Sequence, residues 1–111
     1  MIHKIRLLHR ELYRFGHTLP KRDKLGIHAV IESQCLSLLS IVITAAFEQQ
    51  DNKLSTLKNA RIHFQVLINL LRTEHELNVI KEKTYIHLFK QIAEIGKMIN
   101  GWITYQTQKK P

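Results

Sequence analysis

The fold is decided by the stretch CLSLLSIVITAAF, residues 35–47, which is apolar apart from two serines and one threonine. It belongs to a longer segment, 20–48, in which apolar residues recur at helical spacing. Leu36, Leu39 and Ile43 lie well off the main apolar stripe, so the later half of this helix is apolar nearly all round. Such a helix is central in its domain or is covered on a second side by another subunit, which predicts self-association. The expected core stripe consists of Leu25, Ile31, Cys35, Leu38, Val42 and Ala46.

The same helical period appears in three further segments of the chain. Their apolar stripes are Ile5, Leu8, Leu12 and Phe15 in the first, Leu57, Ala60, Phe64, Leu67 and Leu71 in the next, and Tyr85, Leu88, Ile92, Ile95, Ile99 and Trp102 in the last. Gly16 ends the first helix, and Pro20 opens the second because proline fits the first turn of a helix. The polar hexamer 48–53 contains Asp51 and Asn52, which are good N-cap residues, and is predicted to be a loop. Short connections favour an all-α, antiparallel up-down-up-down four-helix bundle. The predicted helices of this single domain, residues 1–111, are about 2–17, 20–48, 53–74 and 78–105.

Length and cysteine content limit the class of protein further. A chain of 111 residues has room for one domain with one hydrophobic core. Its single cysteine, Cys35, cannot form an internal disulfide, which favours a cytoplasmic protein. The apolar run 35–47 is shorter than the ~20 residues needed to cross a bilayer, so no membrane segment is predicted.

Positive charge dominates the surface that this pattern predicts. Lys and Arg outnumber Asp and Glu by 17 to 9, a formal net charge of +8. The first 24 residues hold seven basic and two acidic side chains, a net +5 of that total. On the first helix five basic residues fall within an arc of about 80° that contains no acid and lies opposite the apolar face. They are His3, Arg6, Arg10, Arg14 and His17.

Two other helices and one connection carry further basic residues. An uncompensated row of arginines suits phosphate groups, because each guanidinium offers a planar fork of donors. Contacts with backbone phosphates give affinity without sequence specificity. Tyr13 and Tyr105 are the few exposed aromatic residues expected to be able to stack on bases. The predicted nucleic-acid-binding residues are Arg6, Arg10, Arg14, Lys21, Arg22, Lys24, Lys58, Arg61, Arg72, Lys83, Lys90 and Lys97.

Two other interpretations of these rows of basic residues remain open at this point. Charge on a solvated helix face keeps a bundle soluble without further function, although mixed signs serve solubility better. Alternatively, the basic face meets an acidic protein surface, and the chain is a protein-binding module with no nucleic-acid role.

Catalytic and metal-binding patterns are not found in the sequence. No two histidines stand four residues apart, and His28 and Cys35 on one helix supply only half of a metal site. Glycine-rich phosphate loops and nucleophile elbows are also missing. We therefore predict no catalytic residue, no metal and no cofactor. Gly96 and Gly101 lie inside the last helical pattern, where each costs roughly 1 kcal/mol relative to Ala. Close approach of another backbone, or a helix end near residues 100–101, would account for them.

The closing segment IAEIGKMINGWI, residues 92–103, resembles the closing motif of the accessory variability determinant proteins of diversity-generating retroelements. The tripeptide at 19–21, LPK, and the placement of Ala60-Arg61 and Leu71-Arg72 are similar to that family too. The likeness extends from about Leu12 to Tyr105. The four-helix proteins encoded within intervening sequences of bacterial ribosomal RNA genes are similar, though less closely.

This resemblance implies a four-helix protomer that assembles into a homopentameric barrel with basic surfaces. It also implies binding to the reverse transcriptase of the element and to its template RNA during mutagenic copying. One residue departs from the family pattern, because Asn100 stands where a small residue is expected before Gly101.

Overall fold

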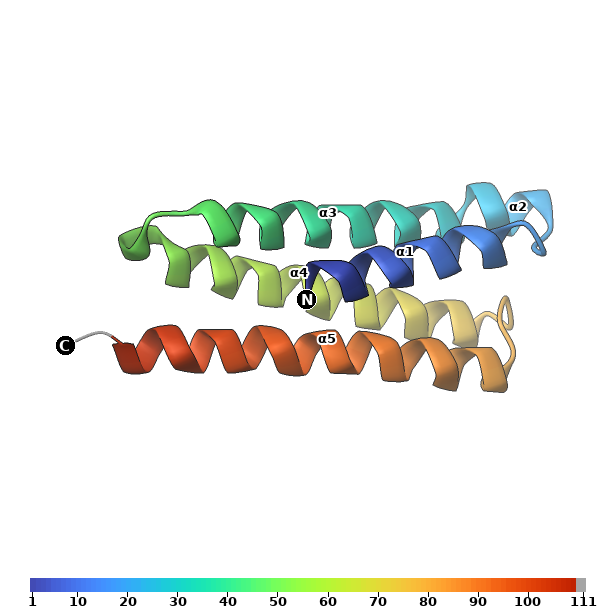
Figure 1. Ribbon diagram of the computed structural model, residues 1–111. Coiled ribbons are helices and arrows are strands. Elements are labelled where there is room, and N and C mark those ends of the chain that lie inside the picture. The colour runs from blue at the N-terminus through green and yellow to red at the C-terminus, as the bar shows by residue number, and fades with distance from the viewer. Residues whose placement is uncertain (110–111) are drawn as a thin grey trace.

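The computed structural model describes residues 1–109, and helices make up nearly all of that part of the chain (Figure 1). α2 and α3 together occupy the predicted second helix, so the described residues form the predicted all-α fold with four helical segments. The elements are α1 (Ile2–Gly16), α2 (Lys21–Leu25), α3 (Ile27–Phe47), α4 (Gln50–Glu76) and α5 (Glu82–Lys109).

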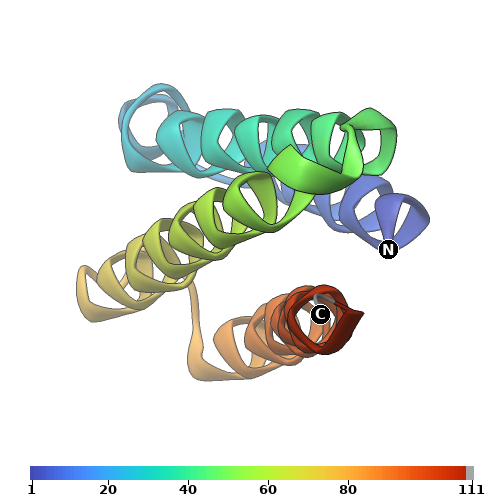
Figure 2. The same ribbon diagram turned by 90° about the vertical axis from the view of Figure 1, so that its left-hand side faces the viewer.

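The molecule is elongated, with extents of 52 × 20 × 19 Å. Followed by colour in Figure 1, α3 and α5 lead toward the end where the C-terminus lies, and α4 leads away from it. Figure 2 shows α1 on one side of the bundle, between α3 and α5. α1 has only 15 residues and begins near the middle of the long axis, so it covers about half of the bundle (Figure 1).

Several helix boundaries differ from those predicted. The predicted second helix is broken at Gly26, where a Cβ atom would lie 2.7 Å from the carbonyl oxygen of Arg22, so only glycine fits. α4 begins at Gln50, and most of the predicted polar loop is helical; Asp51 lies in its first turn, where a carboxylate is favoured by the helix dipole. α5 begins at Glu82 because Asn78 adopts a left-handed conformation, with φ of 61°.

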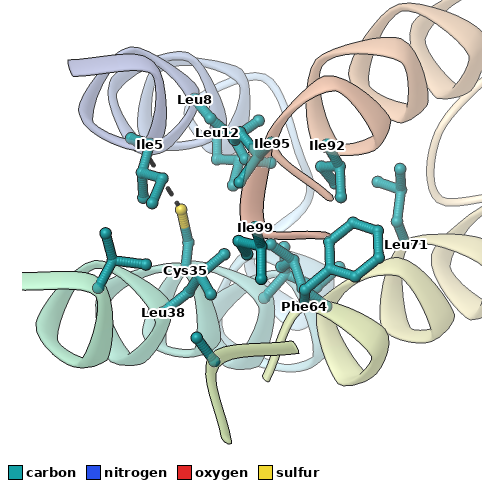
Figure 3. Packing of buried hydrophobic residues seen from close by; sticks show 14 of the residues in the cluster. Ile5, Leu8, Leu12, Cys35, Leu38, Phe64, Leu71, Ile92, Ile95 and Ile99 are labelled. Carbon is teal, nitrogen blue, oxygen red and sulfur yellow. Dashed lines mark hydrogen bonds between the residues drawn. The ribbon is translucent and has the colours of Figure 1, made fainter. Parts of the chain in front are cut away.

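The core is one cluster of buried apolar side chains from α1, α3, α4 and α5, drawn in part in Figure 3. The predicted stripes of the first, third and fourth helices lie in or against this cluster. Cys35 is buried at its centre, and its Sγ lies 3.8 Å from the carbonyl oxygen of Ile5. Burial raises the pKa of the Cys35 thiol to about 12, which makes it an inert packing group.

Two predicted core residues are exposed instead. Leu25 is 65% exposed because the break at Gly26 separates α2 from the stripe of α3. Ala46 is also exposed, and Ala45 is buried in its place. Cys35 contacts Ile5 near the start of α1, and Ala46 lies three turns beyond Cys35, where α1 does not reach. The short α1 thus leaves part of α3 uncovered.

By length and composition, the helical segment Lys21–Phe47 is apolar enough to cross a membrane, and it alone has this property among the described residues. The core helix of a soluble bundle passes the same test. Ile31, Cys35 and Leu38 are fully buried against the other helices, whereas only a minority of the most apolar window is buried within the protomer. The apolar character of α3 therefore exceeds what the rest of the described chain covers.

The two glycines of α5 stand in different surroundings. A Cβ atom on Gly96 would lie 2.4 Å from Cζ of Phe64, so glycine is needed for the α4 ring to pack on α5. The close approach is therefore by a side chain rather than by a backbone. Nothing lies within 4 Å of a Cβ placed on Gly101, and α5 continues through it to Lys109, so the helix does not end at residues 100–101.

These surroundings predict opposite effects for the same substitution. Gly96→Ala forces the buried Phe64 ring to move and should destabilise the fold by about 1–3 kcal/mol, the usual range for overpacking. Gly101→Ala should stabilise the protomer by roughly 1 kcal/mol through helix propensity. Urea unfolding followed by circular dichroism measures both, and a shift in the same direction for the two variants would contradict this packing.

Candidate nucleic-acid interface

All twelve predicted nucleic-acid-binding residues are exposed. Arg6, Arg10 and Arg14 lie on the side of α1 opposite its buried residues. Among residues 1–109 the ion pairs are Lys4–Glu94, His28–Glu74 and His87–Glu11, so none of the twelve is neutralised within the protomer. The arginine row of α1 is therefore an uncompensated cationic surface.

The acidic residue on α1 does not shield this row. Both carboxylate oxygens of Glu11 are bound to α5, one to the ring of His87 and the other to the amide of Gln91 at 2.6 Å. Lys4 pairs with Glu94 on the same flank of α5. The charged contacts of α1 are thus directed at α5 and leave the outer row to the solvent.

The structure does not gather the twelve residues in one patch. Lys83, Lys90 and Lys97 lie on the outer side of α5, away from the buried residues of that helix. Lys58 and Arg61 on α4 border a shallow surface that contains Ile62 and lacks acidic residues. The α1 row and the basic residues of α2 lie close together in the chain and form the densest group.

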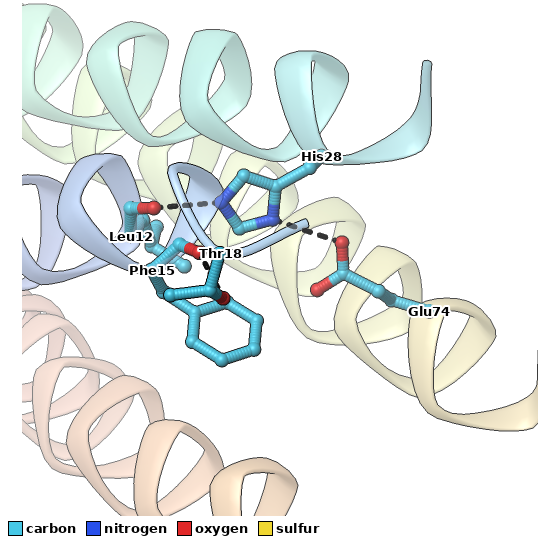
Figure 4. Close-up of polar contacts among 5 residues, drawn as sticks. All are labelled: Leu12, Phe15, Thr18, His28 and Glu74. Atoms are coloured by element: carbon cyan, nitrogen blue, oxygen red, sulfur yellow. Dashed lines mark hydrogen bonds and ion pairs between the residues drawn. The ribbon is translucent and has the colours of Figure 1, made fainter. Parts of the chain in front are cut away.

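The position of α1 is fixed by one buried histidine of α3 (Figure 4). Nε2 of His28 lies 2.7 Å from the carbonyl oxygen of Leu12 on α1, and Nδ1 lies 2.9 Å from Oε2 of Glu74 on α4. Both side chains are fully buried. Gly16 makes room for the ring, because a Cβ there would lie 3.0 Å from Cδ2 of His28. One side chain therefore connects three helices.

The chemistry of its partners sets the protonation of this histidine. A carbonyl oxygen can only accept, so Nε2 donates to Leu12, and Nδ1 donates to the carboxylate of Glu74. Burial lowers the pKa of His28, but the hydrogen bonds to Glu74 and Leu12 and the negative charges of Glu74 and Glu32 outweigh it and raise the pKa above 6.5. Below this raised pKa, the His28 side chain is an imidazolium that faces the Glu74 side chain inside the bundle.

The sequence prediction missed this pair. In the sequence alone, His28 with Cys35 is only half of a metal site, and Glu74 lies in a region where apolar residues become sparse. A signal exists in retrospect, because Glu74 follows Leu67 and Leu71 on the buried stripe of α4, and His28 precedes Ile31 on that of α3. Two oppositely charged groups at core positions of neighbouring helices indicate a buried pair. Among residues 1–109, no group of three His, Cys, Asp or Glu side chains could hold a metal ion.

Comparison with protein families agrees with the resemblance seen in the sequence. A sequence model described as bAvd-like matches residues 1–106. The chain belongs to the bAvd-like family. The match covers all of α1, which carries the arginine row, and most of α5. No curated protein and no solved structure matches the chain. Membership identifies this bAvd-like chain with an accessory rather than a catalytic family.

Breaking one side of the buried pair should be far more harmful than removing both. His28→Leu leaves Glu74 buried without a partner and should cost about 3–5 kcal/mol. The double variant His28→Leu with Glu74→Leu should recover most of this loss, because apolar groups fill the same space. Thermal unfolding compares the three proteins, and equal destabilisation of the single and double variants would rule out a buried ion pair.

The pair also predicts a pH dependence. Because the pKa of His28 is raised in the folded state, its contribution to the free energy of unfolding is fully present below pH 6.5 and is lost as the pH rises through the folded-state pKa. The melting temperature of the wild type should therefore fall relative to that of the double variant as the pH rises above 6.5. Both proteins contain the other histidines, so the pH-dependent contributions of those residues to stability cancel in the comparison.

Proposed function

We propose that this bAvd-like protein is a non-catalytic, cytoplasmic accessory protein of a diversity-generating retroelement. It binds backbone phosphates of RNA or DNA with little sequence specificity and associates with the reverse transcriptase and its template RNA. The observation that carries the proposal is the exposed row Arg6, Arg10 and Arg14, which no carboxylate of the described chain neutralises. Family membership supports the accessory role.

In the proposed assembly, the protein is a homo-oligomer, a pentameric barrel of antiparallel up-down-up-down bundles. Support comes from apolar side chains that one protomer leaves exposed on two sides. One set lies on α4 and includes Ile62 and Val66, and the other lies on α3 and includes Leu36, Ile43 and Phe47. Two different surfaces meeting head to tail form a heterologous contact, which closes into a ring when the rotation permits.

The second candidate function is that of a protein-binding module with an acidic partner and no nucleic-acid role. A groove between α1 and α3 favours it, because apolar residues lie beside basic ones there and acidic residues do not line it. Phosphates require no apolar floor, whereas an acidic amphipathic helix does. The groove is lined by His3, Arg6, Leu7, His9, Arg10, Leu36 and Leu39.

Charge reversal on α1 tests the nucleic-acid role. The triple variant Arg6→Glu, Arg10→Glu and Arg14→Glu should abolish binding of RNA and DNA at low salt while the helical circular dichroism is retained. Filter binding across salt concentrations should show a steep loss of affinity for the wild type. For single-stranded ligands, the slope of log affinity against log salt concentration should become shallower by roughly 0.7 for each phosphate contact that an Arg-to-Ala substitution removes. Unchanged affinity of the triple variant would sink the proposal, and a wild type that binds an acidic protein but no nucleic acid would establish the second candidate.

Self-assembly can be tested separately on α4. Val66→Glu places a charge on the uncovered apolar surface and should shift sedimentation velocity profiles toward the monomer. Leu77→Glu, at an exposed position after the end of α4, is the matched control and should leave the assembly unchanged. A wild type that sediments as a monomer at all concentrations refutes the oligomer but not the phosphate contacts.

A further inference from the structure

An exposed aromatic ring stands at the edge of the arginine row of α1. Tyr13 is 57% exposed. In sequence it is preceded by Arg10 one turn earlier, and it is followed by Arg14 and then by His17 one turn later. On the helix surface, residues three or four apart are neighbours, so the ring lies beside Arg10 and His17, whereas Arg14 points about 100° away round the helix. This is the combination of aromatic and basic groups that single-stranded nucleic acids require of a binding surface.

The ring of Tyr13 has a free face. Its centroid lies 4.9 Å from that of His17, with an angle of 90° between the planes. In such a T-shaped pair, one ring presents its edge to the face of the other, so at most one face of Tyr13 is occupied. His17 also limits the directions that the tyrosine ring can take. The other face is available to a flat ligand.

The other two tyrosines differ in this respect. Tyr85 stacks on His75 with centroids 4.4 Å apart and nearly parallel planes, and it packs against the core. Tyr105 is exposed, but the ammonium of Lys109 lies 5.3 Å from its ring centroid, so the chain already supplies a cation to that ring. Among residues 1–109, no cation lies over the ring of Tyr13.

Phe47 is the most exposed aromatic side chain, at 86%. It lies at the end of α3 opposite to the C-terminal end of α1, and Glu48 follows it directly. Asp51 lies in the first turn of the next helix. The acidic residues near Phe47 oppose the approach of phosphates, whereas the basic residues near Tyr13 favour it.

We infer that Tyr13 is a base-stacking subsite for single-stranded nucleic acid, with Arg10 beside the ring and the rest of the arginine row binding the phosphates of the strand. The inference rests on the proposed function and narrows its ligand from polyanions in general to strands with unpaired bases. In a duplex, base faces are covered by neighbouring pairs, so a duplex reaches only the arginines. Stacking on an aromatic ring accepts every base, which agrees with the low sequence specificity of the proposed function.

The test compares one labelled RNA oligonucleotide of mixed sequence, single-stranded and annealed to its complement. Tyr13→Ala should lower the affinity for the single strand roughly 5- to 150-fold, the range for loss of one stacked base. Its affinity for the duplex and its salt dependence should stay unchanged, because no phosphate contact is lost. Tyr13→Phe should keep wild-type affinity, since the ring face is retained.

Leu77→Ala is the control, because it removes an exposed apolar side chain that lies outside the basic rows, and it should bind both ligands as the wild type does. Equal single-strand affinities of the wild type and Tyr13→Ala overturn the stacking subsite while leaving the proposed function intact. An equal loss for single strand and duplex overturns it as well, since that pattern belongs to a structural or charge effect. A wild type that binds neither ligand at low salt removes the proposed function and this inference together.

Discussion

The hydrogen bonds of His28 are the constraint on which the arrangement of the bundle depends. They join α1 to α3 through the Leu12 carbonyl and α3 to α4 through Glu74, all in the interior. Desolvating two charged groups is costly, and well-packed apolar residues of similar volume are often as stable or more so. The benefit of the pair here is therefore specificity. It holds the short α1 in one register, and α1 carries the densest row of arginines.

The charge distribution follows from how α1 is attached. Its carboxylate, Glu11, is bound to α5, and its inner face is apolar, so the arginines have no partner within the described chain. Like charges four residues apart each destabilise a helix by a few tenths of a kcal/mol. The buried contacts of Ile5, Leu8 and Leu12 contribute far more than this repulsion costs. The fold can thus display a surface whose repulsion is relieved when a polyanion binds.

The sequence predicted the parts of this structure that repeat. The spacing of Leu57, Phe64 and Leu71 located the buried face of α4. The same helical spacing on α1 placed its arginines on the side opposite the buried residues. The sequence did not predict the break at Gly26, where the backbone leaves helical geometry within a segment of helical periodicity. Nor did it predict how much of α3 is covered by α1, because that depends on contacts between distant segments. Nor did it predict the burial of Glu74. A single carboxylate on a core stripe indicates the end of a buried helix face unless a buried partner such as His28 is known. Local periodicity is visible in a chain, whereas pairing across helices is not.

Assembly and nucleic-acid binding are energetically linked under the proposed function. Each protomer carries a net charge of +8, so bringing copies together through the apolar sides of α3 and α4 is opposed by repulsion between their basic rows. A bound strand neutralises those rows and removes the opposition, and an assembled ring in turn offers one strand several arginine rows at high effective concentration. By reciprocity, whatever factor assembly adds to the affinity for the strand, the strand adds to the affinity between protomers. The excess of positive charge thus weakens the contacts between copies of the free protein. The same excess makes assembly and polyanion binding favour each other.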